Sequence, residues 1–236
     1  MDYERSIAEA PNGWRHFAIE DIERLPGPVR LHELARVPAR ELELVAKGDG
    51  AAAERLLRAC FWTLVYHLEP ERWDELARSE PIHPDLLRAL PDTVDVAVDV
   101  GAGSGRLTTH LAARARCVVA VEPSAGLRSL LRRRLPDVTV VSGWAECLPL
   151  RGHVSHLTAA SGAFGPEPRV LAELVRVTAP GGSIVLISPE DPDWFEAHDW
   201  DRITVPPMAA PPHPAWIDDF FGPPDPPHEM VALRVR

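Results

Sequence analysis

The spacing of apolar residues divides the chain into two parts, and the first of them is helical. Between residues 51 and 70, apolar side chains recur at helical spacing, which predicts one buried helical face. That face comprises Leu57, Cys60, Phe61, Leu64, Val65 and Leu68. The segments 70–80 and 81–91 each begin at a proline, which suits a first helical turn, so two shorter helices are expected there. We therefore predict an N-terminal helical cap over residues 1–90.

From residue 94 onward, short apolar strands alternate with helical patterns. Strands are predicted at 94–100, 117–121, 138–141, 157–160, 183–188, 203–205 and 229–235. Helices are predicted at 106–113, after Ser124, from Pro166 to the sequence Pro180-Gly181-Gly182, and at 194–200. Such alternation implies a mostly parallel sheet covered on both faces, with its ligand outside the carboxyl ends of the strands. Residues 91–236 are therefore predicted to form an α/β ligand-binding domain.

The stretch AVDVGAGSGRLTTHLA, residues 97–112, joins the first strand to a helix through a glycine-rich turn. Gly101, Gly103 and Gly105 stand at every second position, and such a turn brings the backbone close to a bound nucleotide. The spacing is not the dinucleotide pattern G-x-G-x-x-G, because Arg106 occupies the place of the third glycine. It is not a P-loop either, because the Gly-Lys-Ser/Thr sequence is missing.

Two acidic residues narrow the choice of nucleotide. Asp99 precedes the first glycine by two positions, where a carboxylate is unfavourable beside a pyrophosphate but favourable beside an ammonium group. Glu122 ends the second strand, at the distance along the chain expected of the acid that accepts hydrogen bonds from ribose hydroxyls. A ligand with a ribose, an ammonium group and no phosphate is S-adenosylmethionine, which we predict as the cofactor.

At this point the sequence resembles the class I S-adenosylmethionine-dependent methyltransferases, in particular the small-molecule group that includes the ubiquinone and menaquinone biosynthesis type. The resemblance covers about residues 94–190 and rests on VDVGAGSGRLTTHLA, VVAVEPS, VTVVSGWAECLPL and LAELVRVTAPGGSIVLISP. It implies a Rossmann-like seven-stranded sheet in the order 3-2-1-4-5-7-6, with the last strand antiparallel.

The resemblance also implies a role for each matching residue. Gly101, Ala102 and Gly103 would wrap the methionine portion of the cofactor, Gly105 belongs to the same turn, and Asp99 would support the ammonium end. Glu122 would bind the ribose, Pro123 would border the adenine, and the Ala145 N–H would meet an adenine ring nitrogen. Trp144 stands where the family often has an aspartate, and an indole can pack on adenine but cannot accept its amino hydrogen bond. His156 likewise replaces a frequent acid at the start of the fourth strand.

Charge and cysteine usage limit the partners. The formal net charge is −10, and the one dense basic run, Arg128–Arg134, fits a solvated helix end, so no nucleic-acid partner is expected. Three cysteines without CxxC spacing, of which Cys60 and Cys117 lie in apolar runs and are expected to be buried, argue against disulfides. No apolar run reaches the length of a membrane span, and the charged N-terminus does not resemble a signal peptide. We expect a soluble, cytoplasmic protein without a membrane partner.

The proline-rich stretches near the C-terminus predict irregular connections, and Trp216, Phe220 and Phe221 are expected to pin them to the body of the protein. Methyl transfer from a sulfonium needs alignment more than a fixed catalytic triad, and the sequence shows no triad and no spaced metal-ligand set. The catalytic residues are therefore unknown. His67, which lies near Trp62, Tyr66 and Trp73, is the first base to test.

Three functions stay open at this stage. The first is methyl transfer to a small-molecule acceptor. The segments 66–76 and 188–201 are acidic and contain tryptophans, so the acceptor is expected to be neutral or cationic. The second is a catalytically silent interaction module that keeps the fold, because Trp144 and His156 depart from the family pattern. The third is a nicotinamide-dependent oxidoreductase, which Asp99 and the glycine spacing disfavour. The acceptor, the atom methylated and the oligomeric state do not follow from the sequence.

Overall fold

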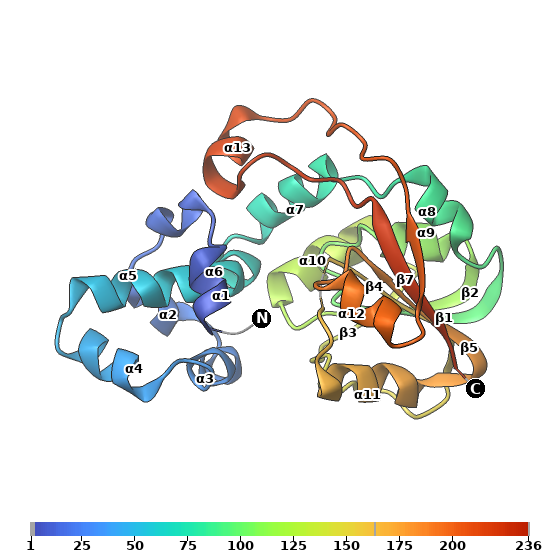
Figure 1. The fold of residues 1–236 in the computed structure, drawn as a ribbon, viewed down its shortest axis with the longest axis horizontal. Helices are drawn as coiled ribbons and strands as arrows, with labels where there is room; N and C mark the ends of the chain where they lie inside the picture. The colour runs from blue at the N-terminus through green and yellow to red at the C-terminus, as the bar shows by residue number, and fades with distance from the viewer. Residues whose placement is uncertain (1–2, 163, 236) are drawn as a thin grey trace. The chain divides into compact units, whose positions relative to one another are not determined.

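The computed structural model describes residues 3–162 and 164–235, and its internal contacts divide the chain into two compact units (Figure 1). Unit 1 comprises residues 1–76 and 212–224, and unit 2 comprises residues 77–211 and 225–236. The chain therefore passes from one unit to the other three times, after Leu76, after Pro211 and after Pro224. The role of the N-terminal helices as a cap, with a boundary near residue 90, stays a prediction.

A seven-stranded sheet forms the centre of unit 2 in the described part of the chain. Its strands are β1 (Val94–Val100), β2 (Ala115–Val121), β3 (Thr139–Val141), β4 (Ser155–Ser161), β5 (Thr178–Ile187), β6 (Asp201–Thr204) and β7 (Glu229–Arg234). They lie in the order β3-β2-β1-β4-β5-β7-β6. The pairings from β3 to β5 are parallel, whereas β7 is antiparallel to both β5 and β6. The predicted fold class, an α/β Rossmann-like methyltransferase sheet with an antiparallel last strand, is confirmed.

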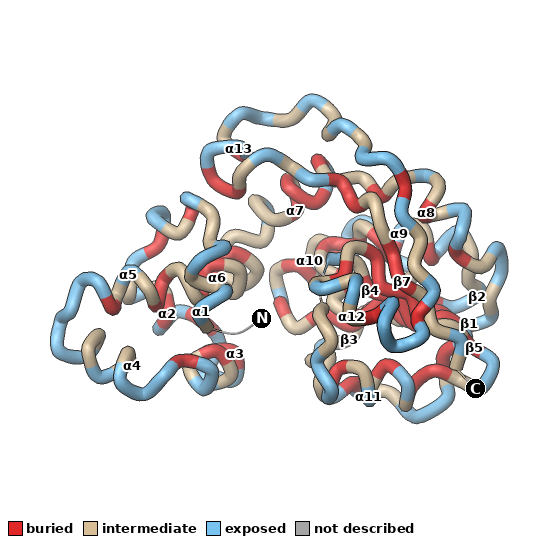
Figure 2. The backbone as a smooth tube through the Cα atoms, viewed as in Figure 1, coloured by how far each residue is buried: buried red, intermediate tan, exposed pale blue. Residues whose placement is uncertain are grey.

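Helices cover both faces of the sheet. They are α8 (Pro84–Ala89), α9 (Thr108–Ala112), α10 (Ala125–Arg134), α11 (Pro168–Val177) and α12 (Pro192–Ala197). Successive strand residues point to opposite faces, and accordingly Ala97 packs in a cluster with Leu111 of α9, whereas Val98 packs in a cluster with Leu174 of α11. Both faces are buried, as the red tube through the strands shows (Figure 2). Because helices cover both faces, the ends of the strands are where a sheet of this kind binds its ligand.

Unit 1 is helical. Its elements are α1 (Tyr3–Ala8), η1 (Asn12–His16), α2 (Ile19–Arg24), α3 (Gly27–Leu34), α4 (Ala39–Ala46), α5 (Gly50–Ala59), α6 (Phe61–Leu68), the first part of α7 (Pro70–Ser79), and α13 (Ala215–Phe221). The predicted apolar face spans α5 and α6, which are separated at Cys60, and all its members are buried except the half-buried Leu68. The spacing of apolar residues therefore predicted the burial but not the interruption.

The helix α13 shows how the proline-rich segment is anchored. The Trp62 and Phe221 rings stack with their centroids 5.8 Å apart and their planes within 6°, and the Phe220 ring lies 5.7 Å from that of Phe61. The expectation that aromatic residues pin this segment is confirmed. The segment joins the N-terminal helices, although the sequence that precedes and follows it belongs to unit 2.

Two expectations are wrong in detail. Cys117 is exposed, because no residue of β2 before Val118 is buried. The helix predicted to run from Pro166 to Pro180-Gly181-Gly182 ends at Val177, and β5 continues through those three residues. The glycines allow this because their backbone pairs with the end of the chain: the Gly181 N–H donates to the Val235 carbonyl at 2.8 Å. No helix among the described residues is long and apolar enough to cross a membrane.

Candidate cofactor-binding site

The glycine-rich turn lies at the carboxyl end of β1, where the predicted site residues meet. Gly101, Gly103 and Gly105 have φ angles of 69°, 56° and 102°, a region of backbone space that favours glycine. The N–H groups of Gly101 and Ala102 both donate to the Val121 carbonyl, at 2.9 and 3.1 Å, which fixes the turn against the end of β2. In the sheet β1 lies between β2 and β4, so the turn stands at the topological switch point, where open α/β sheets bind their ligands.

Glu122 is bound to the turn by hydrogen bonds. One of its oxygens, Oε2, accepts from the Gly103 N–H at 3.0 Å, and Oε1 accepts from the Ser124 N–H at 2.7 Å. The residue is only 5% exposed. Burial raises the pKa of its carboxyl, and the two N–H groups oppose this rise. The structure thus places Glu122 and Gly103, which are 19 positions apart, in direct contact.

Asp99 lies beneath the turn and is 1% exposed. Its Oδ2 accepts from the Thr108 hydroxyl at 2.6 Å, but its buried Oδ1 has no hydrogen-bond partner among the described residues. Burial, supported by the neighbouring Glu122 carboxylate, raises the pKa of Asp99 to about 7, although the Thr108 hydrogen bond acts in the opposite direction. A buried acceptor without a donor is costly, so this oxygen has the chemistry to receive a cationic group.

Sequence reasoning missed the arginines that hold the site together. Arg128 donates to the carbonyls of Glu122 and Pro123, both at 2.7 Å, and Arg134 donates to the Ser104 carbonyl at 2.7 Å. The interpretation of this basic run as a solvated helix end holds for the exposed Arg134 but is wrong for the half-buried Arg128. The signal was their position on the helix that follows Glu122, from which a long side chain can return to the turn.

The loop after β3 places the remaining predicted residues beside the end of β2. A Cβ added to Gly143 would lie 2.8 Å from Val121 Cγ1 and 2.6 Å from Pro149 Cδ, so the loop packs closely on β2. The Cys147 N–H donates to the Trp144 carbonyl at 3.1 Å, which closes a short turn. Trp144, Ala145 and Pro123 are all half-buried. Their contacts with adenine stay predictions.

The two histidines singled out from the sequence lie elsewhere. His67 is half-buried on α6, in unit 1, and its role as a base stays a prediction. His156 is exposed on β4. Among the residues with a described structure, no group of three or more His, Cys, Asp and Glu side chains is arranged to hold a metal ion.

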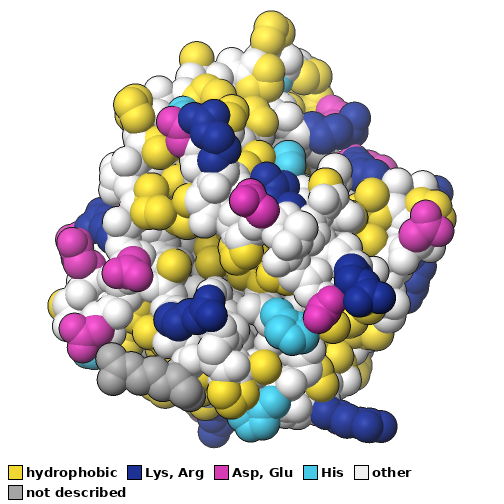
Figure 3. Space-filling view, turned by 90° about the vertical axis from the view of Figure 1, so that its right-hand side faces the viewer, with side chains coloured by type: hydrophobic (Ala, Val, Ile, Leu, Met, Phe, Trp, Pro, Cys, Tyr) yellow, Lys and Arg dark blue, Asp and Glu magenta, His cyan; other side chains and the backbone are white. Residues whose placement is uncertain are grey.

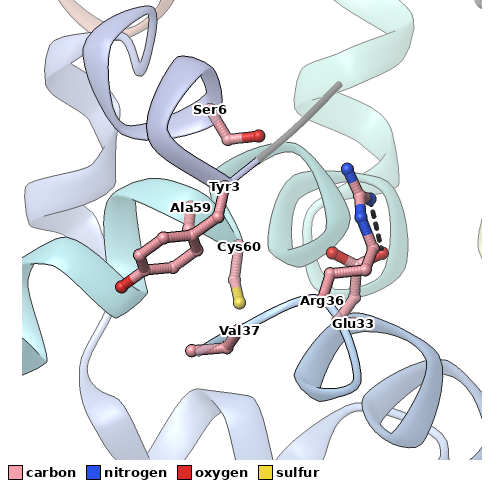
Figure 4. Close-up of a pocket in the computed structure, with 7 residues that line it drawn as sticks. All are labelled: Tyr3, Ser6, Glu33, Arg36, Val37, Ala59 and Cys60. Atoms are coloured by element: carbon pink, nitrogen blue, oxygen red, sulfur yellow. Dashed lines mark ion pairs between the residues drawn. The ribbon is translucent and has the colours of Figure 1, made fainter. Parts of the chain in front are cut away.

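Unit 1 contains a small pocket of its own (Figure 4). It is lined in part by Tyr3, Val37 and Cys60, and the ion pair between Glu33 and Arg36, at 3.7 Å, lies at one side. Burial raises the pKa of the Cys60 thiol to about 12. A thiol with so high a pKa is not a nucleophile near neutral pH, so Cys60 gives this pocket no nucleophile.

Comparison with known proteins agrees with the site. Residues 97–182 match the model of a family described as a methyltransferase domain. The chain carries a class I methyltransferase domain. The matched residues contain every predicted cofactor residue from Asp99 to Ala145, together with the strands β2, β3 and β4. Methyltransferase domains of this class use S-adenosylmethionine, whose ammonium group an ionised Asp99, two positions before the glycine turn, would favour.

The relatives of the methyltransferase domain cover part of the chain. An uncharacterised methyltransferase of Mycobacterium bovis is 37% identical over 100 residues, which is 42% of this chain and 41% of the relative. A demethylmenaquinone methyltransferase of Beutenbergia cavernae is 36% identical over 118 residues, or 48% of each chain. The chain thus spans less than half the length of these curated relatives.

Solved structures resemble the chain more weakly. An S-adenosylmethionine-dependent methyltransferase of Thermotoga maritima has a TM-score of 0.44 and 18% identity, and the match covers 72% of this chain and 90% of that chain. The fold is therefore defined here by the order and direction of its strands.

Proposed function

We propose that the protein transfers a methyl group from S-adenosylmethionine to a small-molecule acceptor. The observation that carries this proposal is a glycine turn that combines two acids: Asp99, two positions before it, has a buried oxygen without a partner, and Glu122 accepts a hydrogen bond from the Gly103 N–H. When bound, the cofactor would supply an electrophilic methyl group on a sulfonium sulfur. The tasks of the chain are then to hold the cofactor, align the acceptor and exclude water.

Each site residue has a role in this proposal. Asp99 supports the ammonium end of the cofactor with its negative charge, and the Thr108 hydroxyl keeps one of its oxygens in place. The turn from Gly101 to Gly105 brings backbone close to the methionine portion. Glu122 accepts hydrogen bonds from the ribose hydroxyls with the lone pairs that the Gly103 and Ser124 N–H groups leave free. Pro123, Trp144 and Ala145 border the adenine.

The acceptor is proposed to be a neutral or cationic small molecule. Three of the relatives are demethylmenaquinone methyltransferases, which favours a small acceptor over a macromolecule. The net charge of −10 opposes the binding of a polyanion. On the face shown in Figure 3, cationic and anionic side chains are interspersed, without the basic patch of a nucleic-acid binder. We propose the cytoplasm as the location.

Calorimetric titration with S-adenosylmethionine, its demethylated product and NAD tests the cofactor. We expect binding of the first two and none of NAD. Gly101→Val should abolish binding, because a side chain would occupy the space of the ligand. Glu122→Ala should weaken it at least tenfold, since each lost hydrogen bond to a charged acceptor is worth about 1.5–3 kcal/mol. Arg116→Gln, at an exposed ion pair with Asp95, is the control and should leave the affinity unchanged.

Acceptors should then be screened in pools sorted by charge, with methylated products detected by mass spectrometry. Methylation of neutral or cationic compounds supports the proposal. Fastest methylation of polyanionic compounds would refute the choice of acceptor and leave the cofactor in place. Binding of S-adenosylmethionine without methylation in any pool would favour the silent interaction module instead.

A further inference from the structure

A half-buried ion pair next to the glycine turn has no part in the roles described above. Arg106 directly follows Gly105, and its Nη1 donates to Glu80 Oε2 at 3.0 Å. The two side chains are only 13% and 17% exposed. The same guanidinium donates through Nη2 to the Ser161 hydroxyl, at 3.3 Å, at the last residue of β4. Arg106 therefore links the ends of β1 and β4, the two strands that flank the switch point.

Glu80 connects this pair to a distant part of the sequence. Its other oxygen, Oε1, accepts from the backbone N–H of Asp225 at 3.2 Å, across 145 positions. Burial raises the pKa of the Glu80 carboxyl, and Arg106 and the Asp225 N–H oppose this rise. Both oxygens of Glu80 are therefore engaged, one by the residue after the glycine turn and one by the C-terminal return of the chain.

Glu80 and Asp225 both lie next to points where the chain passes between the two units. Both belong to unit 2, and each lies just inside it at a crossing from unit 1. The first crossing follows Leu76, four positions before Glu80, and the last follows Pro224, so that Asp225 is the first residue to return. Through one ion pair and one hydrogen bond, Glu80 thus connects the two crossings to each other and to the residue that follows the glycine turn.

The guanidinium of Arg106 packs closely against the backbone after β4. Gly162, the residue after Ser161, has a φ angle of 64°, and a Cβ added there would lie 3.1 Å from Arg106 Nη2. Both side chains are largely withdrawn from water, and the cost of removing charges from water offsets much of their attraction, so the pair is weak evidence for stability. What the structure shows is that the pair connects three segments of the chain.

We propose that Arg106 and Glu80 are positioning residues that couple cofactor binding at the glycine turn to the two chain crossings at residues 77–80 and 224–225. This inference rests on the proposed function, because it takes S-adenosylmethionine as the ligand of the turn. A ligand that fixes the turn fixes Arg106, which restrains Glu80 and, through it, Asp225. The crossings carry the chain to unit 1, so the coupling links an occupied cofactor site to the segments that connect the N-terminal helices and α13.

The sequence offers an unusually specific reporter of this coupling. Asp225 stands between Pro223-Pro224 and Pro226-Pro227, and proline has no backbone N–H. In the stretch 223–227, hydrogen–deuterium exchange therefore reports on one amide, the one that donates to Glu80. Exchange of the full chain should be measured by mass spectrometry with fragmentation, with and without S-adenosylhomocysteine, the demethylated product.

In the wild type, we expect the ligand to slow exchange of the Asp225 amide about fivefold or more, within the range of measured coupling between sites. In the Glu80→Gln and Arg106→Gln variants, the ratio of the exchange rates without and with the ligand should fall to within about twofold of unity. Glutamine at position 80 has one side-chain acceptor in place of two. Ligand affinity, measured by calorimetry, should persist in both variants. Arg116→Gln removes an exposed arginine–aspartate pair and should retain the wild-type ratio.

The outcomes separate this inference from the proposed function. If the wild type does not bind the ligand, the proposed function fails, and the coupling fails with it. If the ligand binds but exchange at Asp225 does not change, or slows equally in the Glu80→Gln variant, the coupling alone is refuted. Should Arg106→Gln not fold, the Glu80→Gln variant, which leaves Arg106 and its charge in place, decides between these outcomes by itself.

Discussion

Asp99 is the residue whose ionisation should matter most for the stability of the empty protein. It is fully enclosed beneath the glycine turn, with one oxygen unpartnered, and its pKa is raised to about 7 from an ordinary value of 3.8. The folded state therefore holds the proton more tightly than the unfolded state does. The stability that this proton contributes is fully present below pH 3.8 and is lost as the pH rises through about 7.

The size of the effect follows from the shift. The pKa of Asp99 differs by about three between the folded and unfolded states, which corresponds to about 4 kcal/mol at about 1.4 kcal/mol for each pKa unit. Asparagine has a similar shape and does not titrate, so Asp99→Asn lacks this dependence. The difference in free energy of unfolding between the variant and the wild type should therefore move in favour of the variant by about 3 kcal/mol between pH 5 and pH 8.

Urea denaturation of both proteins at pH 5, 6, 7 and 8 measures this difference. The titrating groups that do not interact with Asp99 cancel in the comparison, whereas the coupled Glu122 carboxyl contributes to it. Asp95→Asn, on the same strand but with a side chain 62% exposed, controls for the loss of one carboxylate. Saturating S-adenosylmethionine should flatten the pH dependence of the wild type, because its ammonium group favours the ionised carboxylate. A difference that stays constant within about 1 kcal/mol across the pH range would refute this account of Asp99.

Three further predictions concern the turn and the helical unit. Glu122→Gln should weaken cofactor binding less than Glu122→Ala in calorimetry, because the amide retains one acceptor oxygen, and equal losses would contradict a role in ribose binding. Gly105→Ala should lower the free energy of unfolding by about 1–3 kcal/mol in urea, because it forces a side chain into a conformation at φ 102°; Gly50→Ala, where an added Cβ meets nothing within 4 Å, is the control. Phe61→Ala should destabilise the protein by about 3–5 kcal/mol in the same assay, since the ring is 0% exposed and contacts Phe221, and a loss below about 1 kcal/mol would show that the cluster repacks.

The central part of the fold could be predicted because its signals are local. Alternation of apolar residues marked β1 and β7 to within one residue of their ends, and the glycine turn between β1 and α9 follows from residues adjacent in sequence. The order of the strands came from the family resemblance, since the pairing of β1 with β4 joins segments about 60 residues apart. The interruption at Cys60 and the start of β5 at Thr178 were missed, because each depends on contacts that the periodicity of one segment does not contain.

The candidate site divides in the same way. Asp99, Glu122 and the three glycines could be chosen from spacing, because a strand followed by a turn always delivers its last residues to the same edge of the sheet. The hydrogen bonds from Arg128 and Arg134 could not, because they depend on the angle at which α10 packs beside the turn. The lack of a hydrogen-bond partner for Asp99 Oδ1 could not be predicted either, because it depends on all the residues packed around that atom.

The sequence by itself determined the alternation of strands and helices, the glycine turn and the acids that flank it, since each depends on residues a few positions apart. Only the tertiary structure decided that α13 packs with the N-terminal helices, that Cys117 is exposed, and that Glu80 joins Arg106 to Asp225. The physical reason is that burial and long-range hydrogen bonds depend on which segments the folded chain brings together. A carboxylate at position 80 reads as an ordinary surface residue until its partners from positions 106 and 225 surround it.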